Sequence, residues 1–174
     1  MRRLLTAILL SAVVASPLVA QDVAGWGNTR WGMTPEQVFA ALDSQAVRLD
    51  PPRDYTVRGE AWYALAEVRG LQIEGEDYYA RLIFDSTREH LAAVEVKTVR
   101  LNPSNSMHMY HALRQALTAK YGAFSLEDNR DWLSKTTWML DGTIIVLQHA
   151  VYRSSGSSLT VWYEPRLAGR SNGL

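Results

Sequence analysis

The pair of residues whose spacing comes nearest to a metal site is His108 and His111, three positions apart in a segment with helical periodicity. Two histidines at this spacing can direct their imidazoles toward one metal ion. However, no carboxylate lies within a helical turn of the pair to supply a third ligand. We therefore interpret both as surface histidines near a helix N-terminus, and predict neither a metal site nor a cofactor.

The other chemistry-bearing clusters each lack a residue that their chemistry requires. The acidic stretch 127–131 has neither the glycine nor the closing glutamate of an EF-hand calcium loop, which favours a solvated polar loop. Glu74, Glu76 and Asp77 could form an acid–base pair, but adjacent carboxylates on a turn are typical of solvent-facing charge. The serines around Gly156 lack the Gly-x-Ser-x-Gly context, and no phosphate loop or dinucleotide fingerprint occurs. The sequence thus predicts no catalytic residue, and an enzyme whose residues meet only in space stays an alternative.

The composition excludes several classes of protein. The chain has 174 residues, of which 47% are hydrophobic and 10% aromatic, so it has too much apolar surface for a disordered tail. It contains no cysteine, which excludes a disulfide scaffold, a thiolate nucleophile and any cysteine-ligated metal. Basic and acidic residues number 18 each and form no basic stripe, so we predict no nucleic-acid partner.

Residues 1–20 have the pattern of a secretory signal peptide. Arg2 and Arg3 precede an apolar run at 4–14, and Ala20 offers a small residue at a cleavage point before Gln21. The run is shorter than the roughly 20 residues that span a bilayer, although an uncleaved anchor is an alternative. We expect a periplasmic or secreted protein that meets the membrane only through this peptide before cleavage.

Two helices are predicted from capping signals and apolar periodicity. Thr34 suits an N-cap and Pro35 the first helical position, while Gln37 completes a capping box, which predicts a helix at 34–45. A second helix begins near Ser104 or Ser106, and Gly122 is well placed to end it.

Strands are predicted where apolar residues alternate. They cover 62–68, 71–74, 78–84 and 92–98 in the first half, and 136–140, 143–152 and 159–164 in the second. The pair Asp141-Gly142 suits a tight hairpin turn, whereas 50–54, with two prolines, has the composition of a loop.

These elements predict an α+β fold with two layers, in which helices pack on an antiparallel sheet. We expect residues 21–165 to form one domain of two tandem α-β-β(-β) units at about 31–100 and 101–165, followed by a flexible tail at 166–174. A single domain without a repeat is the alternative, because the halves share no residue-level identity.

The segment WGMTPEQV at 31–38 resembles the Gly-Met-Thr helix opening of the SmpA/OmlA (BamE-like) envelope lipoproteins. The repeated helix–sheet order is similar to the tandem units of the β-lactamase inhibitor proteins. This resemblance implies a non-catalytic protein that binds other proteins through its sheet. The chain lacks the lipoproteins' lipobox cysteine and the cysteines of the inhibitors' disulfides, so no functional residue is carried over.

Strand register predicts an exposed aromatic face. A two-residue turn at 141–142 pairs Trp138 with Ile145, and pairing of Tyr152 with Leu159 then places His149 opposite Trp162. Such a mixed aromatic face is typical of protein recognition. The alternative is that an N-terminal segment with two further tryptophans, Trp26 and Trp31, covers it. The predicted partner-binding residues are Trp138, His149, Trp162, Tyr79 and Arg81.

From this face we expect an exported, non-enzymatic protein that binds another envelope protein. The alternative function is a small-ligand carrier, or an uncharacterised enzyme, with a pocket between helix and sheet.

Overall fold

The computed structural model describes residues 24–73, 75–99, 101, 104–152 and 156–166. The predicted signal peptide, Glu74, Ser154 and Ser155, and nearly all of the predicted tail lie outside these residues. The helices are α1 (Pro35–Leu42) and α2 (Ser106–Tyr121), with a 3-10 turn η1 (Asp43–Gln45) after the first. The strands are β1 (Ala46–Val57), β2 (Glu60–Ile73), β3 (Glu76–Phe84), β4 (Leu91–Thr98), β5 (Leu126–Arg130), β6 (Leu133–Met139), β7 (Thr143–Tyr152) and β8 (Gly156–Pro165).

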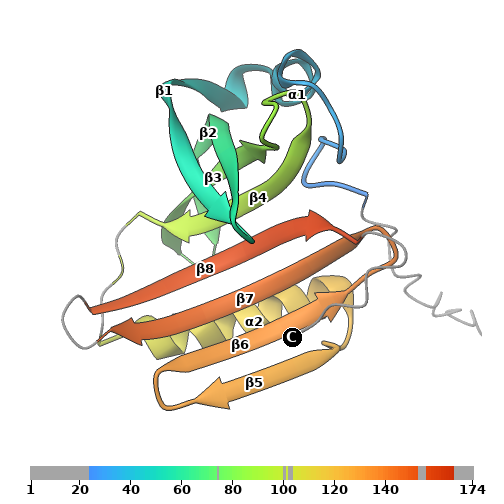
Figure 1. Cartoon of the computed structure of the whole chain (residues 1–174). Helices are drawn as coiled ribbons and strands as arrows, with labels where there is room; N and C mark the ends of the chain where they lie inside the picture. Colours follow the sequence, from blue (N-terminus) through green and yellow to red (C-terminus); the bar gives the residue numbers. More distant parts are fainter. Residues whose placement is uncertain (1–23, 74, 100, 102–103, 153–155, 167–174) are drawn as a thin grey trace, which may run out of the picture.

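The strands form one antiparallel sheet of eight strands in the order β1-β2-β3-β4-β8-β7-β6-β5. Each helix precedes a run of four strands along the chain, and the pairing of β4 with β8 joins the two runs. Figure 1 shows β1–β4 above β5–β8, strongly turned against them, with α2 lying behind the lower strands. The sheet is therefore continuous, although its two parts run in different directions.

The predicted two-layer α+β fold is wrong, because the protein is mainly β, with two short helices beside a large sheet. The prediction missed both edge strands. Residues 50–54 lie within β1 and not in a loop, since Pro51 and Pro52 fall where the register of β1 shifts between Arg48 and Arg53. Proline is tolerated at such irregular positions of an edge strand because its missing N–H removes no ladder hydrogen bond there.

The other edge strand, β5, was predicted as a polar loop at 127–131. This strand has few apolar side chains, but its residues pair in register with β6, for example Asp128 with Lys135. Arg130 forms an ion pair with Asp128 on the same strand, and Glu127 forms one with Arg114 of α2. The strand therefore depends on backbone pairing and charge pairs, which hydrophobic periodicity does not detect.

The predicted helix ends are largely confirmed. The Gln37 backbone N–H donates to Thr34 Oγ1 over 3.4 Å, and the Thr34 N–H donates to Gln37 Oε1 over 3.0 Å, so the capping box is present. The first helix is shorter than predicted and continues as η1. Helix α2 ends at Gly122, whose φ of 86° is readily adopted only by glycine.

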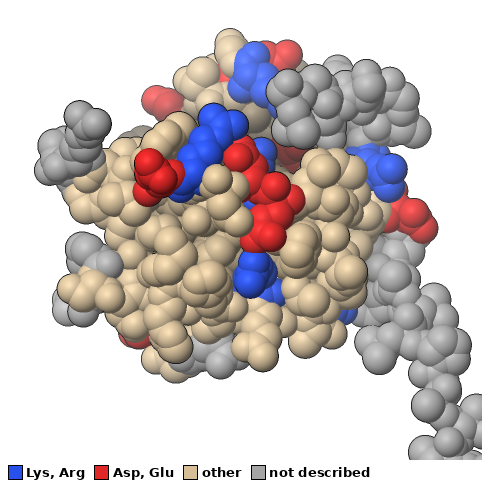
Figure 2. Space-filling view, turned by 90° about the horizontal axis from the view of Figure 1, so that it is seen from below, with Lys and Arg blue, Asp and Glu red and all other residues tan. Residues whose placement is uncertain are grey.

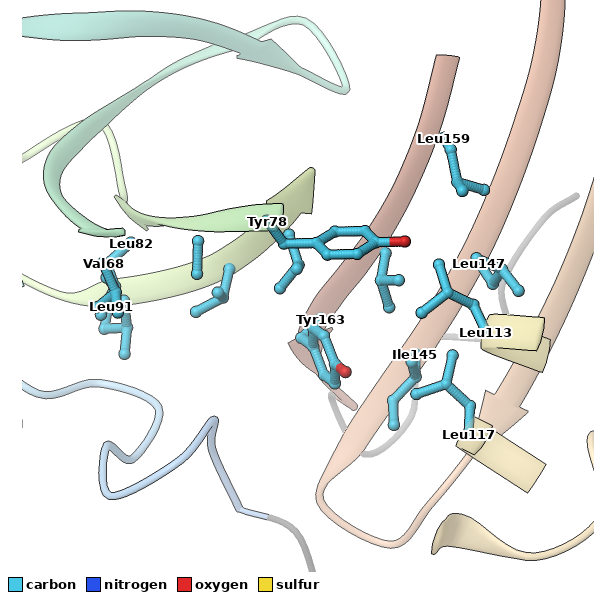
Figure 3. Close-up of a cluster of buried hydrophobic side chains, with 14 of the residues drawn as sticks. Val68, Tyr78, Leu82, Leu91, Leu113, Leu117, Ile145, Leu147, Leu159 and Tyr163 are labelled. Atoms are coloured by element: carbon cyan, nitrogen blue, oxygen red, sulfur yellow. The ribbon is translucent and has the colours of Figure 1, made fainter. Parts of the chain in front are cut away.

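The main core lies on the face of the sheet that carries both helices. One part lies between α2 and the strands that it covers, and another part lies between α1 and the first strands of the sheet. Figure 3 shows how Tyr78 and Tyr163 lie between these two groups of aliphatic side chains. The residues around them are Val68, Leu82 and Leu91 on one side, and Leu113, Leu117, Ile145 and Leu147 on the other.

Candidate functional site

The predicted aromatic face depends on two hairpins, and only one has the predicted register. At the Asp141-Gly142 turn, Trp138 pairs with Ile145 as predicted. In the next hairpin Tyr152 pairs with Gly156 instead of Leu159, a shift of three residues along β8. Because side chains alternate between faces, an odd shift reverses the face that β8 presents relative to β7.

Trp138 and His149 lie on the helix-covered face and not on an exposed one. Trp138 is fully buried, and its Nε1–H donates to the Gly122 carbonyl oxygen over 3.1 Å. His149 is 2% exposed, with Nε2 2.9 Å from Ser106 Oγ at the start of α2. Burial, and to a smaller extent the charge of His111, lower the pKa of His149. Both residues anchor α2 to the sheet, so the predicted surface does not contain them.

Trp162, Tyr79 and Arg81 lie together on the opposite face, which we call the outer face. Trp162 is half-buried, and its ring centroid lies 6.4 Å from that of Tyr55 on β1. The Arg81 guanidinium lies 4.6 Å from the centroid of the half-buried Tyr79 ring. Three of the five predicted residues therefore share a face, and strand β1 partly covers it.

A buried polar network occupies the middle of the outer face. Glu67 and Glu95 are each 6% exposed. Arg81 Nε donates to Glu67 over 3.1 Å and Arg81 Nη1 to the Tyr55 hydroxyl over 3.2 Å, while Tyr55 donates to Glu95 over 2.6 Å. Because buried charges are costly unless they are paired, these mutual contacts explain how the carboxylates are tolerated.

The pKa shifts in this network follow from its geometry. Burial raises the pKa of the Tyr55 hydroxyl, and the neighbouring Glu95 carboxylate raises this pKa further. Burial alone would raise the pKa of Glu67, but hydrogen bonds from Arg69 and Arg81 outweigh it and lower the pKa. The network thus holds Tyr55 as a neutral donor and Glu67 as a carboxylate, which is a structural arrangement and not an exposed acid–base pair.

The N-terminal segment packs on the helix-covered face, so it does not cover Trp162. Trp31 Nε1–H donates to Thr143 Oγ1 over 2.9 Å, and Trp26 packs against the main core. His108 and His111 are both exposed on α2. Within the described residues, no group of three or more histidine, aspartate or glutamate side chains is arranged to hold a metal ion.

A pocket lies between α2 and the sheet, at the junction of its two parts, where the alternative function expected one, although the sequence did not predict its lining residues. Its volume is about 300 Å³. Its lining comes from α2, from β4 and β8, from the end of β2 and from Trp26. The lining residues are Trp26, Leu71, Gln72, Ile73, Val96, Leu113, Ala116, Leu117, Lys120, Tyr121, Val161 and Tyr163.

The end of β2 reaches this pocket beyond a bulge. The pairing of β2 with β3 shifts between Val68 and Leu71, and Gly70 within the shift has a φ of 69°. Isolated glycines in a strand often mark bulges, so Gly70 was a signal that sequence reasoning could have used.

The pocket is apolar with few polar groups. Tyr163 is almost fully buried, and burial raises the pKa of its hydroxyl, as does the neighbouring Tyr121. Gln72 at the rim donates to Asp77 outside the pocket. Lys120 is the only charged side chain among the described residues that line the pocket. Apolar cavities of this size with a few polar groups are typical of sites for small molecules.

Elsewhere the surface is mixed in charge. Figure 2, which views the molecule from below in the orientation of Figure 1, shows acidic and basic side chains side by side in the middle of this face, with uncharged surface around them. The described part of this face therefore carries no large patch of only positive or only negative charge. No helix in the described ranges is both long and apolar enough to cross a membrane.

Comparisons of the chain with protein-family models, with curated proteins and with solved structures gave no significant match. The geometry of the described residues therefore carries the functional argument that follows.

Proposed function

We propose that the protein binds a small, mainly apolar ligand in the pocket between α2 and the sheet, without catalysing a reaction. The observation that carries the proposal is the cavity of about 300 Å³ lined by aliphatic and aromatic side chains. The pocket is partly open to solvent and mainly apolar with a few polar groups, which is the usual form of a site for a small molecule. The signal-peptide pattern at 1–20 supports a ligand carrier that acts in the periplasm or outside the cell.

The size of the cavity sets the size of the ligand. An apolar cavity of about 150 Å³ accepts benzene, so about 300 Å³ corresponds to about 12 carbon atoms. We therefore choose decan-1-ol as a neutral probe of suitable length. At a probe concentration ten times its Kd, binding to the folded state alone adds about 1.4 kcal/mol of stability. For a domain of this size that raises Tm by about 3–6 °C.

The test is to fill the pocket from its helix wall. Ala116 lines the pocket, whereas Ala119 is exposed on the same helix and does not line it. We expect Ala116→Phe to abolish the decanol-induced rise in Tm, because the new ring occupies the cavity, and Ala119→Phe to preserve it. An Ala116→Phe protein that is folded by circular dichroism and still responds like the wild type would contradict the proposal.

A second candidate function is the binding of an envelope protein at the outer face. This function is supported by the half-buried rings of Trp162 and Tyr79 and by the Arg81 guanidinium, which lies over the Tyr79 ring. It predicts that Tyr79→Ala removes a specific cross-linked adduct in the native cells, while the purified variant keeps the wild-type Tm. An unchanged adduct pattern in a folded Tyr79→Ala protein would argue against this function.

A further inference from the structure

The polar groups of the pocket indicate which kind of apolar ligand it takes. We infer that the ligand is an anionic amphiphile, with a single acyl chain of about ten carbons in the cavity and its acidic head at Lys120. This inference rests on the proposed function, because it assigns a ligand class to the same pocket.

The first argument is the charge of the lining. Lys120 lies in the last turn of α2 and is exposed, so a charged head bound there would stay at the water boundary. Among the residues that the structure describes, no aspartate or glutamate lines the pocket. Lys120 forms no ion pair with any residue that the structure describes, and its amine lies 5.0 Å from the Tyr121 ring centroid. Its charge is therefore available to a ligand head at the mouth of the pocket.

The second argument is the pair of hydroxyls near that charge. Tyr121 and Tyr163 both line the pocket, and Tyr121 lies near enough to raise the pKa of the Tyr163 hydroxyl. A tyrosine hydroxyl can donate to a carboxylate oxygen, and burial keeps that of Tyr163 protonated. A cation with a neighbouring hydroxyl donor suits an acidic oxygen head better than a neutral or a positive one.

The third argument is that the length of a ten-carbon chain matches the volume of the pocket. Decanoate has twelve non-hydrogen atoms, which is about the content that a cavity of about 300 Å³ accommodates. A phospholipid with two long chains far exceeds this volume. The shared chemistry is one chain with one acidic head, and the source is either a free fatty acid or a lipid held in a membrane.

The experiment compares decanoate with decan-1-ol by calorimetry on the mature chain, because the two differ only in the head. We expect the wild type to bind decanoate about fivefold more tightly than decanol, as the gain from one solvent-facing charge pair implies. Lys120→Glu replaces this attraction with repulsion, so decanoate affinity falls about tenfold or more while decanol affinity changes less than twofold. Far-ultraviolet circular dichroism checks that the variant is folded, since a cation near a helix C-terminus also stabilises the helix.

The control variant is Lys135→Glu, on β6. Its neighbours Ser134 and Thr136 are buried on the helix-covered face, so Lys135 lies on the other face, away from the pocket. We expect this variant to bind both probes like the wild type. Equal decanoate affinity in folded Lys120→Glu and wild type, or equal affinity of the wild type for both probes, would overturn the acidic-head assignment.

Two further outcomes separate the possibilities. Failure of the wild type to bind either probe would refute the proposed function itself, together with this inference. Co-sedimentation with phosphatidylglycerol vesicles distinguishes the sources: we expect none, because the pocket accepts one chain. Binding to the vesicles without binding to free decanoate would overturn the inference.

Discussion

Replacing Trp138 by alanine tests whether this indole is an anchor of α2 or part of an exposed face. The side chain is fully buried, its Nε1–H donates to Gly122, and its ring meets Phe124 edge-on at 6.4 Å between centroids. Truncation of a buried tryptophan costs about 3–5 kcal/mol. Since the whole domain is stable by about 5–15 kcal/mol, Trp138→Ala removes a large fraction of that stability.

Urea unfolding followed by far-ultraviolet circular dichroism measures this loss without depending on tryptophan emission. With a slope of about 2 kcal/mol per molar urea, the midpoint of unfolding falls by about 2 M. The matched variant is Trp162→Ala on the outer face, where the ring is only half-buried, and we expect a loss of about 1 kcal/mol. Equal midpoints for Trp138→Ala and the wild type would refute the placement of Trp138 beneath α2.

Three other predictions follow from the buried polar groups and the N-terminal turn. Burial lowers the pKa of His149 in the folded state below its unfolded value of about 6.5. The neutral imidazole therefore contributes its full stabilisation above about pH 6.5, and this stabilisation is lost as the pH falls below that value. We expect His149→Gln to make the free energy of unfolding depend less on pH between pH 7 and 5. Arg81→Met leaves Glu67 with one fewer partner and should cost about 2–3 kcal/mol in urea unfolding, whereas the double variant with Glu67→Gln should lose less than the sum of the two single losses. In Gly25→Ala the new Cβ would lie 1.9 Å from a backbone carbonyl oxygen, so the turn must shift and trypsin should cleave after the exposed Arg30 faster than in the wild type.

Local signals predicted the parts of the fold that short-range chemistry determines. The capping box at Thr34, the end of α2 at Gly122 and the register around Asp141-Gly142 each depend on residues within a few positions of one another. The β7–β8 hairpin was different, because its serine- and glycine-rich connection allows several loop lengths. An error of three residues there placed Trp162 on the same face as His149.

The face of the sheet that the helices cover could not be read from the β6–β7 hairpin alone. Both faces of that hairpin carry apolar residues, including the pair Ile144 and Ile145, so alternation did not identify the buried side. A pocket between helix and sheet was expected only as an alternative, and its lining residues could not be predicted, because they come from segments far apart in the chain that meet through the β4–β8 pairing. Only the Gly70 bulge left a local sign of it.

The two edges of the sheet limit how this protein can meet other chains. An unprotected edge invites another strand to pair with it, which leads to edge-to-edge aggregation or to capture of an extended peptide. Here β1 presents two prolines at an irregularity, and β5 is five residues long with acidic and basic side chains along it. Both ends of the ladder thus resist pairing with the edge strand of a second copy, even where the chain is concentrated.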